Sequence, residues 1–178
     1  VTDSEVFASI AAWEHVIVRN NTFTTPDPYQ NGKSFFCLDF DPTWSRRPLV
    51  DVQVVDNTFE YTGSLAAGTK GMIGLYDCGY GPHTGIVVAR NIFRSSDTDV
   101  KFISVPEAEA SFACLASENN LVYSADGAAP LFTRRTATPT FYTLAQWRLL
   151  TGNDQATQVH TNPNLPVPGW AKAPAADE

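Results

Sequence analysis

The stretch VIVRNNTF, from Val16 to Phe23, is written three more times along the chain. The later copies read VQVVDNTF at 52–59, IVVARNIF at 86–93 and LASENNLV at 115–122. In each copy an asparagine stands two places before a large apolar residue, and these asparagines are Asn21, Asn57, Asn91 and Asn120. They lie 36, 34 and 29 residues apart. Self-similarity at a period of about 20–50 residues predicts a solenoid, in which the repeats stack.

Three largely apolar columns appear when the copies are aligned on their asparagines. Five places before the asparagine stand Val16, Val52, Ile86 and Leu115. Three places before it stand Val18, Val54, Val88 and Ser117, and two places after it stand Phe23, Phe59, Phe93 and Val122. Alternate residues of a strand point to the same face of a sheet. The pattern therefore predicts strands with one buried face in every copy.

The asparagine itself lies between two short predicted strands, where the chain must bend. Asn tolerates the left-handed backbone conformation better than any residue except Gly, and its side chain bonds neighbouring backbone groups. If successive copies stack, their amides align, and we expect each to hydrogen-bond the next in a ladder.

A second family of strands lies between the copies: SFFCLDF at 34–40, GMIGLYD at 71–77 and DVKFISV at 99–105. Each repeat then contains a strand, a loop, a second strand, the Asn bend and a short third strand. In this arrangement the sequence resembles the pectate-lyase-like superfamily, from roughly Val6 to Val122. The resemblance implies an all-β fold, a right-handed parallel β-helix of about four rungs with an Asn ladder. The alternative is a β-sandwich with coincidental NTF turns.

The segment TLAQWRLLTGND at 143–154 predicts a short helix that caps the solenoid. Thr143 and Gln146 form a capping-box pattern, and Gly152 is a C-cap glycine. Leu144, Trp147 and Leu150 recur at helical spacing. This end resembles the C-terminal part of bacterial carbohydrate-active β-helix proteins, although NPNL at 162–165 replaces their D-P-x-F. We therefore divide the chain into rungs over 1–135 and a cap helix with an irregular tail over 136–178.

The other end of the chain shows no cap motif before the first copy. An uncapped rung presents unpaired backbone groups, which other strands can join. We expect the chain to continue a longer solenoid, or an N-terminal β-helix chain or segment to pack on residues 1–12.

Composition narrows the function classes. The net charge is −7, with 19 acidic and 12 basic residues, so neither nucleic acid nor an anionic membrane is the expected partner. Cys37, Cys78 and Cys114 are an odd and widely spaced set, which indicates buried thiols rather than disulfides or a zinc site. The chain opens on Val1 rather than Met, which is compatible with a removed upstream segment. We expect a secreted or periplasmic protein.

The repeats exceed the rung length that the resemblance implies, and the surplus lies in loops. One set of loops covers 25–33, 63–71 and 95–99, and the other covers 39–48, 77–85 and 106–111. Loops on one edge of a solenoid stack into a groove. From the second set and its flanking strands, Asp39, Asp77 and His83 are the catalytic candidates. The candidate substrate-binding residues are Asp41, Trp44, Arg46, Tyr76, Tyr80 and Lys101.

These residue types suit a sugar site. Carboxylates on rungs ~4.8 Å apart can approach the ~5–5.5 Å of a retaining glycosidase, and those two rungs apart the inverting range. Trp44 and Tyr80 can stack on sugar rings, and Arg46 or Lys101 can bind a uronate carboxylate. A lyase would use the same groups while a base removes the adjacent proton.

Structural interpretations compete with each of these roles. Asp77 and the Asp41-Pro42 pair read equally well as turn residues. His83 reads also as an exposed loop histidine, and Arg46 as a solvated charge or a partner of Asp51. Signature motifs of polygalacturonases, pectate lyases and alginate epimerases are absent from the sequence. No cofactor is expected; calcium near Asp97 and Asp99 is the one ion for which the sequence offers oxygen ligands.

By resemblance, the expected function is binding and cleavage of a polysaccharide or oligosaccharide, by a glycoside hydrolase or a polysaccharide lyase. The alternatives are a non-enzymatic structural or adhesive β-helix, such as a tailspike or surface protein, and the scaffold half of a split enzyme. Function inferred from a fold is an analogy, because one fold hosts many activities.

Overall fold

The structure is a computed structural model of the 178-residue chain. It describes residues 6–10, 14–25, 36–40, 47–61, 71–75, 83–95, 100–105, 114–124, 126–134, 138 and 140–161. For residues 6–10, 25, 36–40 and 71 it describes the backbone and not the side chain.

Sheet A contains six described strands in the spatial order β1-β4-β7-β10-β13-β14. They are β1 (Val6–Ile10), β4 (Phe36–Phe40), β7 (Gly71–Leu75), β10 (Lys101–Val105), β13 (Phe132–Arg134) and β14 (Thr140–Tyr142). Neighbours are parallel except β13 and β14, whose antiparallel pairing makes the sheet mixed. The predicted strand family at 34–40, 71–77 and 99–105 is confirmed as β4, β7 and β10 over the residues described.

Sheets B and C are parallel throughout their described strands. Sheet B has the order β11-β8-β5-β2, and sheet C the order β15-β12-β9-β6-β3. The strands of sheet B are β2 (Glu14–Arg19), β5 (Val50–Val55), β8 (Thr84–Ala89) and β11 (Leu115–Glu118). Those of sheet C are β3 (Thr22–Thr25), β6 (Thr58–Tyr61), β9 (Ile92–Ser95), β12 (Leu121–Ser124) and β15 (Gln158–His160).

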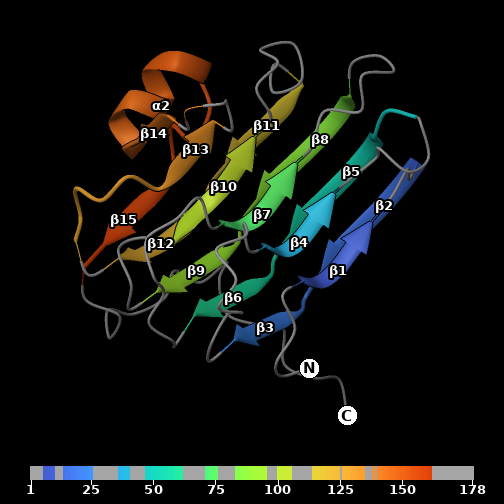
Figure 1. Cartoon of the computed structure of the whole chain (residues 1–178), viewed down its shortest axis with the longest axis horizontal. Coiled ribbons are helices and arrows are strands. Elements are labelled where there is room, and N and C mark those ends of the chain that lie inside the picture. The colour runs from blue at the N-terminus through green and yellow to red at the C-terminus, as the bar shows by residue number, and fades with distance from the viewer. Residues whose placement is uncertain are drawn as a thin grey trace.

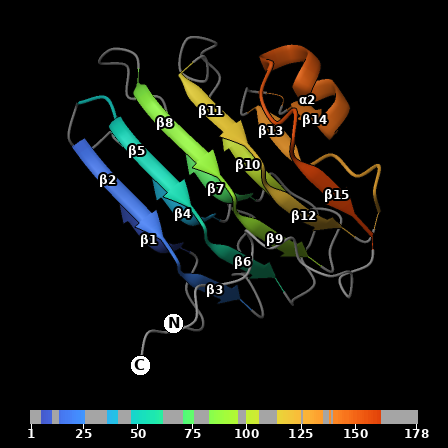
Figure 2. The ribbon, with the colours of Figure 1, turned by 180° about the vertical axis from the view of Figure 1, so that it is seen from behind.

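The chain visits the three sheets in a fixed order. It passes from sheet A to sheet B to sheet C four times, and each pass pairs with the pass before it (Figure 1). Seen from behind, β2, β5, β8 and β11 run side by side and lead into the strands of sheet C (Figure 2). The antiparallel pairing on which a β-sandwich depends occurs, among the described strands, only between β13 and β14. The β-sandwich alternative is therefore wrong.

The predicted asparagine ladder is confirmed. The Oδ1 atom of Asn57 accepts hydrogen bonds from the backbone N–H and the Nδ2 of Asn21, at 3.0 and 3.1 Å. Asn91 accepts the same two bonds from Asn57, and Asn120 accepts them from Asn91. Every step has the same polarity, because each asparagine donates to the next one along the sequence.

The left-handed residue at each bend is not the ladder asparagine but the residue before it. These residues are Asn20, Asp56, Arg90 and Asn119, with φ between 53° and 58°. The expectation that the ladder asparagine takes this conformation is therefore wrong. The residue before the asparagine makes the left-handed turn, and the asparagine that follows directs its amide along the ladder, where Asn57, Asn91 and Asn120 are buried.

The apolar columns are buried as predicted in the middle of the stack. Val52, Val54, Ile86 and Val88 are at most 1% exposed. The rings of Phe23, Phe59 and Phe93 stack at centroid distances of 5.0 and 4.9 Å. Neighbouring strands lie ~4.7–4.9 Å apart, so equal register in successive passes brings the rings into contact. Ser117, the polar member of its column, donates its hydroxyl to Asp154.

Helix α2 (Leu144–Thr151) closes the C-terminal end of the stack. Its predicted capping box is confirmed, since Gln146 N–H donates to Thr143 Oγ1 and Thr143 N–H donates to Gln146 Oε1. Gly152 has the left-handed conformation expected of the C-cap, with φ 74°. Trp147 is fully buried and stacks on Phe132 at 4.7 Å. Leu150, expected on the apolar face, is 44% exposed.

The last ladder asparagine bonds to the cap and not to a further asparagine. The backbone N–H of Asn120 donates to Thr157 Oγ1, and its Nδ2 donates to Asp154 Oδ1. Asp154 also accepts the indole N–H of Trp147 at 3.0 Å. One buried carboxylate thus joins the ladder to the helix.

Candidate functional site

The sheet topology brings the ends of the predicted second loop set to stacked positions. β4, β7 and β10 are neighbours in sheet A, and β5, β8 and β11, which they lead into, are neighbours in sheet B. The connections over 41–49, 76–83 and 106–114 therefore start and finish at stacked positions. We name this corner the A–B edge and define it by the second residues of β2, β5 and β8, which are His15, Asp51 and Gly85, with Leu49 and His83 nearby. Most of the connecting residues lie outside the part of the chain that the structure describes.

Asp39 lies on β4, and the register of sheet A shows which residues lie beside it. Its Cα is in register with Ser9 on one side and Gly74 on the other, and Gly74 is in register with Ser104. The residue beside Asp39 in the next repeat is therefore Gly74 and not Asp77. The predicted pairing of two carboxylates on neighbouring rungs does not arise within these strands. The side chain of Asp39 is outside the described part, as are Asp41, Trp44, Arg46, Tyr76, Asp77 and Tyr80.

His83 is buried at the A–B edge, with 1% of its surface exposed. Its Nδ1 accepts the backbone N–H of Leu49 at 3.0 Å. The neutral imidazole therefore carries its proton on Nε2, because Nδ1 acts as an acceptor. The interpretation of His83 as an exposed loop residue is wrong. Its hydrogen bond joins two successive repeats.

Lys101 is also buried, at 3% exposure, and its Nζ lies 5.4 Å from the ring centroid of Phe141. It is the first residue of β10, whereas His83 directly precedes β8. Sheet A strands run from the sheet C side toward the A–B edge, so these two residues belong to opposite ends of a repeat (Figure 1). The structure does not bring Lys101 together with His83.

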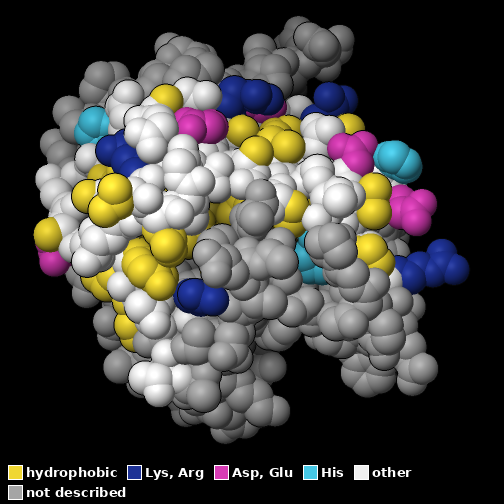
Figure 3. All heavy atoms as spheres, turned by 90° about the horizontal axis from the view of Figure 1, so that it is seen from above, with side chains coloured by type: hydrophobic (Ala, Val, Ile, Leu, Met, Phe, Trp, Pro, Cys, Tyr) yellow, Lys and Arg dark blue, Asp and Glu magenta, His cyan; other side chains and the backbone are white. Residues whose placement is uncertain are grey.

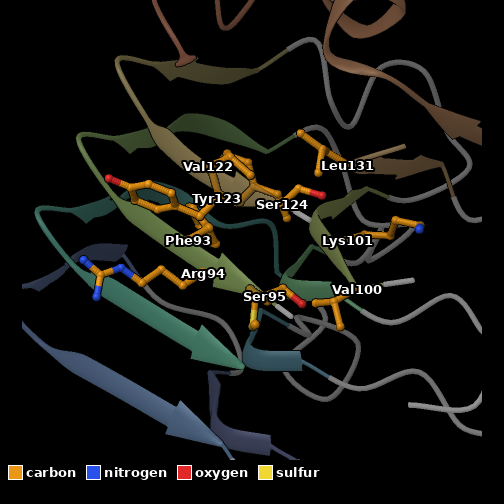
Figure 4. Close-up of a pocket in the computed structure, with 11 residues that line it drawn as sticks. Phe93, Arg94, Ser95, Val100, Lys101, Val122, Tyr123, Ser124 and Leu131 are labelled. Atoms are coloured by element: carbon orange, nitrogen blue, oxygen red, sulfur yellow. The ribbon is translucent and has the colours of Figure 1, made fainter. Parts of the chain in front are cut away.

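A small cavity lies beside Lys101, between the ends of β9 and β12 and the start of β10 (Figure 4). The space open to the centre of a water molecule is about 20 Å³, which is room for about one water. Figure 4 shows Arg94 and Tyr123 directed to one side and Lys101 to the other, so the charged groups do not converge. The Arg94 guanidinium lies 5.4 Å from the Tyr123 ring centroid. A sugar ring does not fit in this cavity.

Sequence reasoning missed a histidine–aspartate pair at the A–B edge. His15 Nδ1 lies 2.9 Å from Asp51 Oδ2, and the side chains are 74% and 48% exposed. The second oxygen of Asp51 accepts a hydrogen bond from Gln53 Nε2 at 3.3 Å. These hydrogen bonds, first from His15 and then from Gln53, lower the pKa of Asp51 below its ordinary value.

The pair orients the imidazole. A carboxylate only accepts hydrogen bonds, so Nδ1 of His15 must carry a proton, and in the neutral ring Nε2 is left with the lone pair. A histidine oriented in this way by a carboxylate is a suitable general base. The repeat alignment contained the signal, since His15, Asp51 and Gly85 each precede the column of Val16, Val52 and Ile86.

These three aligned residues share a left-handed backbone, with φ of 61°, 51° and 66°. A Cβ on Gly85 would lie 3.2 Å from the Cα of Asp51, so glycine permits the close approach. Left-handed residues occur at both ends of the sheet B strands, where they turn the chain, so this conformation alone does not define a site. The histidine–carboxylate pair distinguishes the A–B edge from the asparagine bend, where the corresponding pair is Asp56–Arg90.

Other features of the described residues offer no cofactor site. No group of three or more His, Cys, Asp or Glu side chains within the described ranges is arranged to hold a metal ion. Asp97 and Asp99, the residues considered for calcium, lie outside those ranges. Cys114 is half-buried, and burial raises the pKa of its thiol.

In the space-filling view, charged side chains of both signs are scattered over the visible face (Figure 3).

Comparison with protein-family models, with curated proteins and with solved structures finds no match to this chain. In the part of the chain described, no helix is both long and apolar enough to span a membrane.

Proposed function

We propose that this chain is a right-handed parallel β-helix that binds a polysaccharide or oligosaccharide along the A–B edge and cleaves it. The β-helix is supported by the fixed order of the three sheets and by their parallel pairing. Right-handedness is supported by a general rule, since a crossover between parallel strands of one sheet is right-handed in nearly all proteins. The sequence resemblance to pectate-lyase-like proteins supports a sugar polymer as the substrate class. A secreted or periplasmic setting fits that substrate.

The observation that carries the proposal is the His15–Asp51 pair, held across two repeats at the edge where the connections from sheet A to sheet B finish. In a lyase, His15 Nε2 takes the proton from a sugar carbon, the electron pair forms a C=C bond, and the glycosidic oxygen leaves and takes a proton from solvent. In a hydrolase, His15 Nε2 takes a proton from water, whose oxygen bonds to the sugar carbon as the glycosidic C–O bond breaks and the leaving oxygen takes a proton from solvent. In both reactions Asp51 stabilises the charged ring of His15 that results. Stacked loops of successive repeats form the long groove that a polymer needs. Asp39, at the end of β4, and the loop residues Asp41, Trp44, Arg46, Tyr76, Asp77 and Tyr80 are proposed to line it.

The test is a panel of neutral and uronate polysaccharides, such as xylan, pectin and alginate. Binding is measured by retardation in affinity gels. Hydrolysis is followed by reducing ends, and elimination by the ultraviolet absorbance of unsaturated uronate. We expect His15→Ala to lower the cleavage rate by about 10²–10⁴-fold, the usual contribution of a general base, with unchanged circular dichroism.

The matched control is Asp56→Asn. It breaks Asp56–Arg90, another exposed ion pair between successive repeats, at the asparagine bend. This variant should cleave at the wild-type rate. Equal rates for His15→Ala and wild type would remove His15 from the mechanism. Absence of binding to every member of the panel by a folded sample would overturn the polysaccharide proposal.

A structural or adhesive β-helix is the second candidate. It is favoured by the strand edges at the N-terminal end of the stack, where β1, β2 and β3 each have a described neighbour on one side only. Light scattering across a concentration series separates the two candidates. A stable trimer without cleavage favours the adhesive protein.

A further inference from the structure

We propose that the face formed by β2, Asn21 and β3 receives a further three-strand repeat of the same kind, continuous with β1 and carrying its own ladder asparagine. This inference rests on the β-helix part of the proposed function and not on the sugar chemistry. The observation behind it is the hydrogen-bonding position of Asn21 that no described residue fills.

The proposed interface has the same form as those between successive repeats within the molecule. Each internal asparagine accepts two N–H bonds at Oδ1 from the preceding asparagine. Each also donates from Nδ2 to a carbonyl of the preceding repeat: Asn57 to Val18, Asn91 to Val54 and Asn120 to Val88. One asparagine in register thus satisfies three groups of its neighbour.

On the face formed by β2, Asn21 and β3, Asn21 lacks hydrogen bonds that the internal asparagines make. Its N–H donates to Asn57, and its Nδ2 donates to Asn57 Oδ1 and to the carbonyl of Arg19. Its Oδ1 accepts no hydrogen bond from the described residues. Asn21 is exposed, whereas Asn57, Asn91 and Asn120 are at most 1% exposed. Val16 and Val18 are half-buried, whereas their counterparts Val52 and Val54 are buried.

The direction of the ladder hydrogen bonds indicates which partner fits this face. The open position is an acceptor, so the occupant must offer N–H groups, and the preceding asparagine of a parallel repeat offers a backbone N–H and an amide N–H. A second copy docked face to face would place its own Asn21 Oδ1 against this one, acceptor to acceptor. The chemistry therefore favours a parallel repeat over a symmetric dimer.

The test adds a repeat to the full chain. A copy of residues 36–70, which runs from β4 to the residue before β7, is inserted ahead of Val6, so that it leads into β1 as it normally leads into β7. Hydrogen exchange of the β2 and β3 amides is then compared with that of the original chain. We expect exchange of these amides to slow at least tenfold. A matched extension, with Asn57→Ala in the added copy only, should lose most of this protection.

A second variant keeps the proposal falsifiable if the added repeat folds poorly. Asn21→Leu removes the open acceptor, so its effect on the thermal midpoint should be small in the original chain and several-fold larger in the extended chain. Equal effects in the two chains, or unchanged exchange in β2 and β3, would overturn the proposal. So would a dimer of the original chain, seen by light scattering, with β2 and β3 already protected.

These readouts involve no polysaccharide, so failure of the sugar proposal leaves them unaffected. Failure of the β-helix itself appears differently, because β5 and β6 would then exchange as fast as β2 and β3.

Discussion

The two ends of the stack are built from the same repeat but finish differently. At the N-terminal end, Asn21 keeps an acceptor that no described residue fills, and Val16 and Val18 stay half-buried. At the C-terminal end, Asn120 bonds to Thr157 and Asp154, and Trp147 covers the core with 0% exposure. A strand at the edge of a sheet leaves backbone groups unpaired, so stability at each end depends on the groups that cover the terminal repeat.

The closed end also shows how a ladder can be stopped. Thr157 Oγ1 and Asp154 Oδ1 together replace the single Oδ1 that a further asparagine would supply. The other oxygen of Asp154 accepts the Trp147 indole, and its backbone carbonyl accepts Arg148 Nε. The ladder therefore stops on groups that also anchor α2. Three predictions test this contrast between the closed and open ends, and a fourth concerns an ion pair that lies away from both.

Trp147→Ala should have the largest effect. Loss of a fully buried indole costs about 3–5 kcal/mol of unfolding free energy, since a cavity remains above Phe132. Urea unfolding measures it. Phe23→Ala, a change of the same kind in a half-buried ring at the open end, should cost clearly less. Leu149→Ala, at a side chain that is 91% exposed, should stay within about 0.5 kcal/mol. Equal losses at Trp147 and Phe23 would remove the distinction between the ends.

Asn91→Ala should cost about 2–4 kcal/mol, because buried partners such as the Asn57 N–H and the Val54 carbonyl lose their bonds. Asn21→Ala should cost below about 1 kcal/mol, because that amide is exposed and makes fewer contacts. The same urea titrations give both values. A ladder in which the two substitutions cost the same would contradict the burial gradient.

Asp154→Asn should cost about 1–3 kcal/mol at neutral pH, because an NH₂ group then faces a donor such as the Trp147 indole. Burial raises the pKa of Asp154 above its ordinary 3.8, against hydrogen bonds from Thr157, Ser117, Asn120 and Trp147 that lower it. The folded state therefore keeps the proton to higher pH than the unfolded chain. The advantage of wild type over the variant should be largest below about pH 3.8 and decline as pH rises through the raised pKa.

Unfolding free energies of the two proteins over a pH series check this sign. Asp56→Asn, at a half-buried and ion-paired carboxyl, is the control for the loss of a charge. An advantage that grows with rising pH would mean that the hydrogen bonds outweigh burial at Asp154.

Arg90→Ala should have the smallest effect, below about 1 kcal/mol. The Arg90–Asp56 pair is bidentate at 2.7 and 2.8 Å, but its side chains are 46% and 31% exposed. It lies between two internal repeats and contributes to neither end. The effect should shrink at high salt, which screens exposed charges. A salt-independent loss of several kcal/mol would show that the pair is more than a surface contact.

Most of the architecture was predictable because its signals are local. Alternating apolar residues around Asn57 and Asn91, and the Thr143–Gln146 capping box, involve residues a few places apart. The left-handed residue was misplaced by one position, since Asn20-Asn21 and Asn119-Asn120 offer two asparagines for one role.

The candidate site was predicted less well. His83 shares the A–B edge with the loop ends, but it is buried and bonded to Leu49, 34 residues away, which its own segment does not indicate. Lys101 was grouped with residues that lie at the other end of the repeat. The His15–Asp51 contact spans 36 residues, and both side chains look ordinary in their own segments.

By itself, the sequence determined the strands, the asparagine ladder and the capped helix, because periodicity and capping act over one turn or one strand. Only the tertiary structure decided that His15 meets Asp51, that His83 is buried and that Lys101 lies away from both. Those contacts depend on the register between repeats and on the closure of long connections. Each of these contacts joins residues more than 30 positions apart, so no pattern of neighbouring residues predicts it.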